Sequence, residues 1–106
     1  MIAFDVRLNG KRICIAGAED LTVLRTSIHA LGKLGARTVP ARADEKAEVF
    51  YSINGLTSRS DPDKDVHMWW KSTTPLEVGD VIQVKVLKVN KADPPKSREK
   101  AVRNRA

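Results

Sequence analysis

The sequence predicts an α+β domain in which one amphipathic helix packs across a mixed sheet of four to five strands. Three observations lead to this fold class. They are a long alternating segment near the C-terminus, an Asn-Gly dipeptide between two alternating segments near the N-terminus, and a change in the hydrophobic period after Gly17. In the expected topology the first and last long strands lie side by side and run parallel.

The segment from Val81 to Val89 carries the clearest strand signal. It follows the turn signal Gly79-Asp80, and within it Ile82, Val84 and Val86 occupy one face of a period-two pattern. β-branched residues also occur on the other face near its start, which is typical of a strand that is covered on both sides. We therefore predict that this strand is central in the sheet.

A β-hairpin is predicted at the N-terminus, where Asn9-Gly10 separates two alternating segments. Both loop residues of a type I′ turn need positive φ, which asparagine and glycine tolerate best. The predicted register puts the apolar residues of both strands on one face and Cys14 on the other. The opposed pairs in this register are Leu8 with Lys11, Val6 with Ile13, and Phe4 with Ile15.

An amphipathic helix is predicted after the hairpin. Asp20 is a candidate N-cap, and the glycines near residue 32 are candidate helix terminators. Apolar residues three and four positions apart form one stripe that would cover the hairpin. This stripe consists of Leu21, Leu24, Ile28 and Leu31.

Two further features complete the predicted order of elements. Val49, Tyr51 and Ile53 alternate and lead into a second Asn-Gly dipeptide, Asn54-Gly55, which predicts a strand entering a turn. Residues 58–65 form a polar loop between this strand and a short aromatic segment.

Length and charge indicate one domain with a basic tail. The 106 residues suffice for one hydrophobic core and not for two. Residues 90–106 hold a net charge of +4 out of the total of +6, and Asp93-Pro94-Pro95 near their start ends regular structure. We therefore expect a single domain over residues 1–89 and a disordered tail over residues 90–106.

The single cysteine excludes an intramolecular disulfide and favours a reducing, cytoplasmic location. No basic leader followed by an apolar block is present, and no apolar run is long enough to cross a bilayer. Neither secretion nor a membrane partner is expected.

The order of predicted elements resembles the β-grasp or ubiquitin-like fold, and within it the small sulfur-carrier proteins of the ThiS and MoaD type. The resemblance is carried by residues 8–11, 21–24 and 74–82. Sulfur carriers act through a C-terminal Gly-Gly, whereas this chain ends in Arg105-Ala106, so the resemblance implies their scaffold without their chemistry. Residues 78–89 are also similar to a strand of S1-type RNA-binding barrels, although the predicted helix does not suit that fold.

No catalytic, metal or cofactor motif is found. Asp61, Asp63 and Asp65 have the spacing of the first ligands of a calcium loop, but Val66 replaces the required glycine and Ser72 the bidentate glutamate. No nucleophile elbow or phosphate-binding glycine loop occurs. We expect a binding protein without a cofactor rather than an enzyme.

Trp69 and Trp70 carry most of the functional information. Adjacent residues of an extended segment point to opposite faces, so one ring is expected in the core and the other at the surface, although both rings could also be covered. An exposed tryptophan with a histidine, a methionine and a lysine around it is typical of a partner-docking surface. The residues predicted to bind a partner are His67, Met68, Trp69, Trp70 and Lys71.

Two functions follow as hypotheses. The first is a non-enzymatic protein-interaction module, such as a bacterial inhibitor or immunity-type protein, that binds another protein. The alternative is a single-stranded RNA or DNA-binding protein that uses basic residues for phosphate contacts and a tryptophan for base stacking. The basic residues assigned to this alternative are Lys85, Lys88, Lys91, Lys96, Arg98, Lys100, Arg103 and Arg105.

Overall fold

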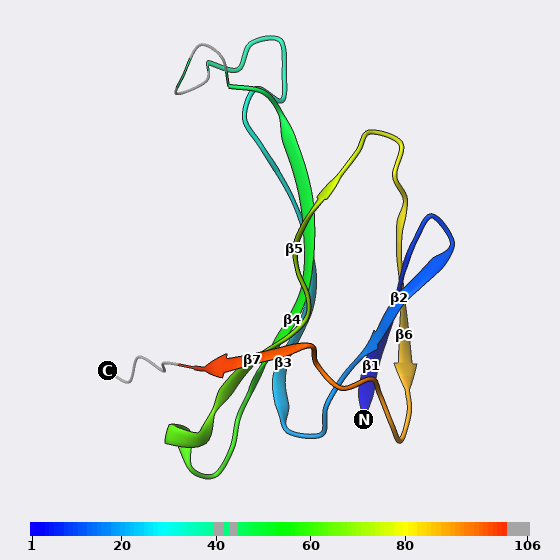
Figure 1. Cartoon of the computed structure of the whole chain (residues 1–106), viewed down its shortest axis with the longest axis vertical. Coiled ribbons are helices and arrows are strands. Elements are labelled where there is room, and N and C mark those ends of the chain that lie inside the picture. Colours follow the sequence, from blue (N-terminus) through cyan, green and yellow to red (C-terminus); the bar gives the residue numbers. More distant parts are fainter. Residues whose placement is uncertain (40–41, 43–44, 102–106) are drawn as a thin grey trace.

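The computed structural model describes residues 1–39, 42 and 45–101, and these residues form an all-β structure (Figure 1). No α-helix occurs among them, so the predicted α+β class and the β-grasp resemblance are both wrong. In chain order the elements are β1 (Ile2–Leu8), β2 (Lys11–Ala16), β3 (Leu21–Leu31), β4 (Glu48–Thr57), the 3-10 helix η1 (Pro62–Lys64), β5 (Val66–Leu76), β6 (Ile82–Lys88) and β7 (Ser97–Lys100).

The strands form two antiparallel sheets. Sheet A has the order β2-β1-β6, and sheet B has the order β3-β4-β5-β7. The inner faces of the two sheets supply one hydrophobic core, which is the usual arrangement of a β-sandwich. The buried core residues are Val6, Cys14, Ala16, Tyr51, Ile53, Met68 and Trp70.

Residues Leu21–Leu31, predicted as a helix, form strand β3. The apolar spacing of this segment fits a helical period, but the segment also alternates, and it contains the β-branched residues Thr22, Val23 and Thr26. Ten residues of β3 pair with β4, from Leu21 to Leu31. These cross-strand contacts outweigh the weak helix propensity of the segment, because tertiary pairing overrides local preference.

The strand predicted to be central is β6, and it lies at an edge of sheet A. It pairs with β1 over seven residues, so the first strand and this late strand do lie side by side. Their direction is antiparallel, however, and the predicted parallel pair is wrong. The alternating pattern of the segment predicts an extended conformation, but it does not indicate which strands pair with it.

The N-terminal hairpin is present, with Asn9 at φ 52° and Gly10 at φ 82° in its turn. The predicted register holds for the two pairs nearest the turn, Leu8 with Lys11 and Arg7 with Arg12, and then changes at a β-bulge between Val6 and Arg7. Because the bulge adds one residue on β2, Cys14 is moved to the apolar face, where it is buried in the core. Past the bulge, the observed pairs are Val6 with Cys14 and Phe4 with Ala16.

The second Asn-Gly dipeptide does not form a turn. Asn54 and Gly55 are both buried inside β4, between β3 and β5. A Cβ on Gly55 would lie 2.6 Å from the carbonyl oxygen of Val23 and 3.1 Å from the side chain of Leu21. Glycine is needed here for the close approach of β3, rather than for a turn.

The residues expected to form a disordered tail contain strand β7, which pairs with β5 from Val66 to Trp69. The segment before β7 runs from sheet A to sheet B, and Asp93 connects it to both sheets. Its N–H donates to the Ile15 carbonyl, its Oδ2 accepts from the Ile15 N–H, and its carbonyl accepts from Trp70 Nε1. Residues 102–106 lie outside the described part of the chain.

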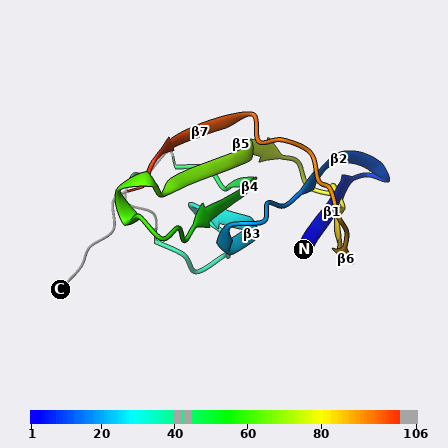
Figure 2. The same ribbon diagram turned by 90° about the horizontal axis from the view of Figure 1, so that it is seen from below.

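The two sides of the sandwich therefore differ. In Figure 2, β2 and β7 lie on one side and β3 and β6 on the other. The Asp93 segment joins the sheets on the first side, which we call the closed side. On the second, the open side, the aliphatic side chains of Ile28, Val84 and Val86 are exposed.

Candidate partner-binding surface

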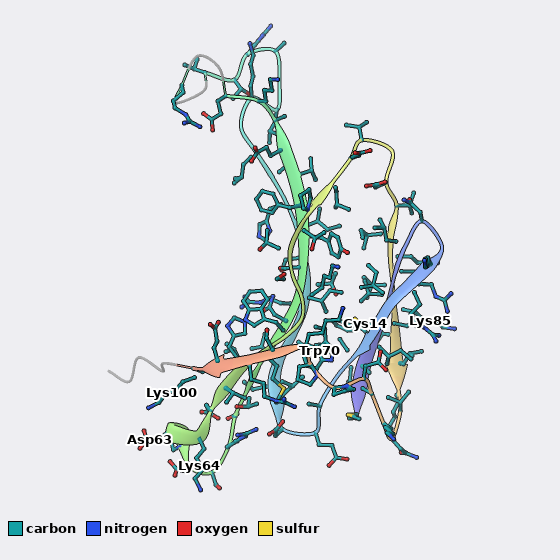
Figure 3. All side chains as sticks on the ribbon, in the orientation of Figure 1. Cys14, Asp63, Lys64, Trp70, Lys85 and Lys100 are labelled. Atoms are coloured by element: carbon teal, nitrogen blue, oxygen red, sulfur yellow. The ribbon has the colours of Figure 1, made fainter. Side chains whose placement is uncertain are left out.

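The two tryptophans occupy opposite faces of β5. Trp70 is the core residue: it is 1% exposed, and its indole N–H donates to the carbonyl of Asp93 at 2.8 Å. Figure 3 shows its ring between the two sheets, on the same side of sheet B as Cys14. Trp69 is half-buried on the outer face of sheet B. The alternation of a strand thus separates a structural tryptophan from one that a partner could reach.

The five residues predicted to bind a partner are only in part brought together. His67 and Trp69 share the outer face, and their rings stack with centroids 4.5 Å apart and an interplanar angle of 31°. Met68 and Trp70 are buried in the core and cannot contact a partner. Lys71 is half-buried after a β-bulge.

The Cys14 thiol belongs to the core, not to this surface. Burial raises its pKa to about 11, and the charge of Asp93 adds to the effect, while Lys96 and Lys71 act in the opposite direction. The thiol is therefore protonated at neutral pH and a poor nucleophile.

Asn54 organises the centre of the outer face. Its Oδ1 accepts hydrogen bonds from Arg25 Nε at 2.9 Å and pairs with His67 Nε2 at 3.0 Å. Arginine can only donate, so the orientation of the Asn54 amide is fixed, and His67 Nε2 must act as a donor to the same oxygen. The amide Nδ2 in turn faces Ser52 Oγ at 3.5 Å. Asn54 therefore links β3 to β5 across β4.

Glu99 on β7 contacts both His67 and Trp69, on the side of β5 away from Asn54. Its Oε1 accepts from Trp69 Nε1 at 3.1 Å and lies 3.4 Å from His67 Nδ1. The outer face thus carries a continuous set of contacts, which we call the aromatic network. Its members are Arg25, Asn54, His67, Trp69 and Glu99.

A shallow pocket of about 410 Å³ adjoins Trp69 at the junction of β5 and β7. Hydroxyl groups and one arginine share its walls with the indole ring. An aromatic ring beside several polar side chains is the usual composition of a specific binding pocket. The lining residues are Trp69, Ser72, Thr73, Ser97, Arg98 and Glu99.

The basic residues of the nucleic-acid hypothesis are divided between the sheets. Lys85 and Lys88 belong to β6, whereas Arg98 and Lys100 belong to β7. Figure 3 shows Lys85 and Lys100 on opposite sides of the molecule, Lys85 beside sheet A and Lys100 beside β7. Lys91 and Lys96 lie in the connecting segment and are exposed, while Arg103 and Arg105 lie outside the described residues. One continuous phosphate track through all of these residues is not formed by the described part of the chain.

Lys85 instead belongs to a second polar cluster, on the outer face of sheet A. It pairs in register with Asp5, which binds Arg12 through two hydrogen bonds of 3.2 Å and Arg7 through one of 3.3 Å. The hydrogen bond from Arg12 holds the pKa of Asp5 below its ordinary value, against the effect of burial, and Arg7 adds to the lowering. Because the aspartate charge is matched within the sheet, the cluster has a structural explanation.

Sequence reasoning missed Arg25, Asn54 and Glu99 for identifiable reasons. Each was placed in the wrong element: Arg25 in a helix, Asn54 in a turn and Glu99 in a disordered tail. The period-two spacing of the polar residues Arg25, Ser27 and His29 was the one available signal for a polar outer face.

The aspartates of residues 61–65 stabilise a turn. Asp61 caps η1 by accepting from the Asp63 N–H at 3.0 Å, and Asp65 accepts from the Thr57 hydroxyl and the Arg59 N–H. No group of three or more metal-ligating side chains occurs within residues 1–39, 42 and 45–101. No helix in that part of the chain could cross a membrane.

Comparisons with known proteins give no relative. No family model matches the chain, and neither a curated protein nor a solved structure is detectably similar to it. The resemblance to sulfur carriers is therefore without support from sequence or structure, and the functional argument depends on the surface alone.

Proposed function

We propose that the chain is a non-enzymatic protein-interaction module, such as an inhibitor or immunity-type protein, and that it binds its partner on the outer face of sheet B. The observation that carries the proposal is the position of Trp69, which lies on a sheet face that no other described element covers (Figure 2). Tryptophan and arginine are the residues most enriched at the energetic centres of protein interfaces. Arg25 and Trp69 belong to the same network on this face.

The aromatic network supports the proposal because it fixes these side chains before binding. The Trp69 ring is held by its hydrogen bond to Glu99 and by stacking on His67. Ordering a free side chain at an interface costs roughly 0.5–1.5 kcal/mol, and a ring that is already held avoids most of that cost. A preorganised aromatic side chain on an uncovered face is expected of a binding surface.

The chemistry of the face indicates what the partner presents. The indole ring of Trp69 requires an apolar recess, and the exposed guanidinium of Arg25 requires hydrogen-bond acceptors. Phe50 and His29 extend the aromatic surface further along β3 and β4, with ring centroids 5.8 Å apart. We expect a partner surface with an apolar centre and carboxylate or carbonyl groups around it.

The experiment compares Trp69→Ala with Val78→Ala in affinity purification from the source cells, followed by quantitative mass spectrometry. Val78 is fully exposed in the loop before β6 and serves as the matched control. A partner that binds through the outer face should be depleted about 30-fold or more by Trp69→Ala, as for a central interface residue, and retained by Val78→Ala. Equal recovery with both variants would refute the proposal.

A second candidate function is favoured by one observation. Arg98 lines the pocket beside Trp69, and Lys96 and Lys100 are exposed at the same edge. A stacking ring beside cationic groups is the arrangement by which single-stranded nucleic acids are bound. Against it, Glu99 lies in the same pocket and would repel phosphate.

Fluorescence anisotropy with labelled single-stranded RNA and DNA tests this alternative. Nucleic-acid binding would weaken steeply as salt is raised and would be reduced by Trp69→Ala and Arg98→Ala. Lys85→Ala is the control, since Lys85 lies in the other sheet. No saturable binding at low salt would remove the alternative and leave the protein-partner proposal.

A further inference from the structure

The open side of the sandwich is formed by two edge strands, β3 of sheet B and β6 of sheet A, and both carry exposed apolar side chains. Val84 on β6 and Val6 on β1 are opposed in register and share a face, yet Val84 is 41% exposed and Val6 is 0% exposed. In sheet B the opposed residues Ile28 and Tyr51 are 56% and 2% exposed. In each pair the exposed residue lies on an edge strand, β6 in sheet A and β3 in sheet B, and no strand in the described chain extends sheet B beyond β3 to cover them.

Strand β3 is also the least protected edge of the molecule. Natural edge strands are commonly blunted by short length, by lysines or by proline. Edge strands β2, β6 and β7 each carry at least two lysines or arginines. Strand β3 is eleven residues long, contains no proline, and has Arg25 as its only lysine, arginine or carboxylate. A long unblunted edge offers a row of backbone donors and acceptors to another strand.

The Thr26 hydroxyl indicates where another strand would pair with β3. The hydroxyl of Thr26 is buried and has no hydrogen-bond partner among the described residues. Thr26 lies near the middle of the strand, on the inner face, in register with Ile53. A buried hydroxyl without a partner is unfavourable, so a neighbouring strand that supplies a partner is favoured once the Thr26 side chain rotates about χ1 toward the edge of the sheet.

We propose that β3 pairs antiparallel with β3 of a second copy of this chain, about a two-fold axis at Thr26. Residues opposed across antiparallel strands share a face, and opposed threonines can hydrogen-bond to each other. This register brings the two Thr26 hydroxyls together, places Leu24 opposite Ile28 of the second copy, and places Arg25 opposite Ser27 of the second copy. Such an isologous contact closes after two chains, as in most homodimers.

Neighbouring registers are less favourable. An axis at Arg25 would oppose the two Arg25 side chains, and an axis at Ser27 would oppose Arg25 to His29 of the second copy. Only the axis at Thr26 pairs the buried hydroxyls without placing two basic side chains directly opposite each other. Charge and hydrogen bonding therefore select the same register.

The second copy also covers the open side. Its β3 becomes the next strand of sheet B, on the side where Val84 and Val86 lack cover (Figure 2). The two B sheets then form one sheet of eight strands. Because the axis is perpendicular to that sheet, both Trp69 side chains remain on one outer face, and the dimer would present two partner-binding surfaces in the same direction.

The experiment is sedimentation equilibrium of the full chain over a concentration series, with two variants at one position. Ser27→Lys places a lysine opposite Arg25 of the second copy, and Ser27→Glu places a carboxylate there. Both changes are on the outer face, so circular dichroism should show both variants folded. Opposed like charges destabilise a strand pair and opposite charges stabilise it, and the contact occurs twice, so we expect about tenfold weaker and about tenfold tighter dimers, respectively.

Several outcomes would overturn the proposal. A wild-type chain that remains monomeric at every concentration excludes the dimer. Equal weakening by Ser27→Lys and Ser27→Glu contradicts the Thr26 register, because an axis at Ser27 opposes position 27 to itself. No effect of either variant on a dimer that does form shows that the contact is elsewhere. None of these results bears on partner binding by Trp69, which the depletion experiment tests separately.

Discussion

The closed and the open sides of the sandwich show what holds the two sheets together. On the closed side, Asp93 bonds to Ile15 of sheet A and to Trp70 of sheet B, so a single residue connects both layers to the core. On the open side, no hydrogen bond between described residues joins β3 to β6, and the apolar side chains there are exposed. The comparison indicates that the closed side supplies the cohesion of the fold, while the open side is available for association.

The largest expected effect is at the core of the closed side. Trp70→Ala removes a ring that is 1% exposed and should lower the free energy of unfolding by about 3–5 kcal/mol. Trp69→Ala, at the adjacent position on the outer face, should lower it by less, about 1–2 kcal/mol, because that ring is only half-buried and its stacking and hydrogen bond lie at the surface. Urea unfolding followed by circular dichroism measures both. Similar losses for the two variants would contradict the assignment of one structural and one surface tryptophan.

A smaller effect on stability is expected from a change in the Asp93 segment, which connects the two sheets. Asp93→Ala removes the carboxylate that accepts from the Ile15 N–H at 2.8 Å and should destabilise the fold by about 1–2 kcal/mol. Asp63→Ala, an exposed aspartate in η1, is the matched control and should change stability by less than about 0.5 kcal/mol. If the two aspartates prove equivalent in urea unfolding, the Asp93 segment does not connect the sheets in solution.

The sequence was sufficient to predict those elements whose conformation depends on residues close by in the chain. The alternation of residues 2–8 and 82–88 predicted β1 and β6, and Asn9-Gly10 predicted the hairpin turn. It was insufficient where conformation depends on a distant strand. Leu21, Leu24 and the apolar residues after them fit both a helical and an extended period, and only their pairing with β4 decides between the two.

The candidate surface was predictable in part for the same reason. Strand alternation predicted that Trp69 and Trp70 differ in exposure, but the choice between them depends on which face of β5 meets sheet A. Glu99 could not be assigned, because β7 is ordered by its pairing with β5 and the tail sequence carries no strand signal of its own. The aromatic network depends on the pairing of four strands, β3, β4, β5 and β7, none of which the sequence pattern places next to another.

The most direct test of the difference between the two sides compares Val6→Ala with Val84→Ala. The two valines are opposed in register on the same face of sheet A, but Val6 lies in the central strand β1 and is 0% exposed, whereas Val84 lies in the edge strand β6 and is 41% exposed. At concentrations too low for self-association, Val6→Ala should lower the free energy of unfolding by about 2 kcal/mol and Val84→Ala by less than about 1 kcal/mol, because only the first leaves a buried cavity. Equal losses at low concentration would show that β6 is covered within the single chain, and the open side would not exist.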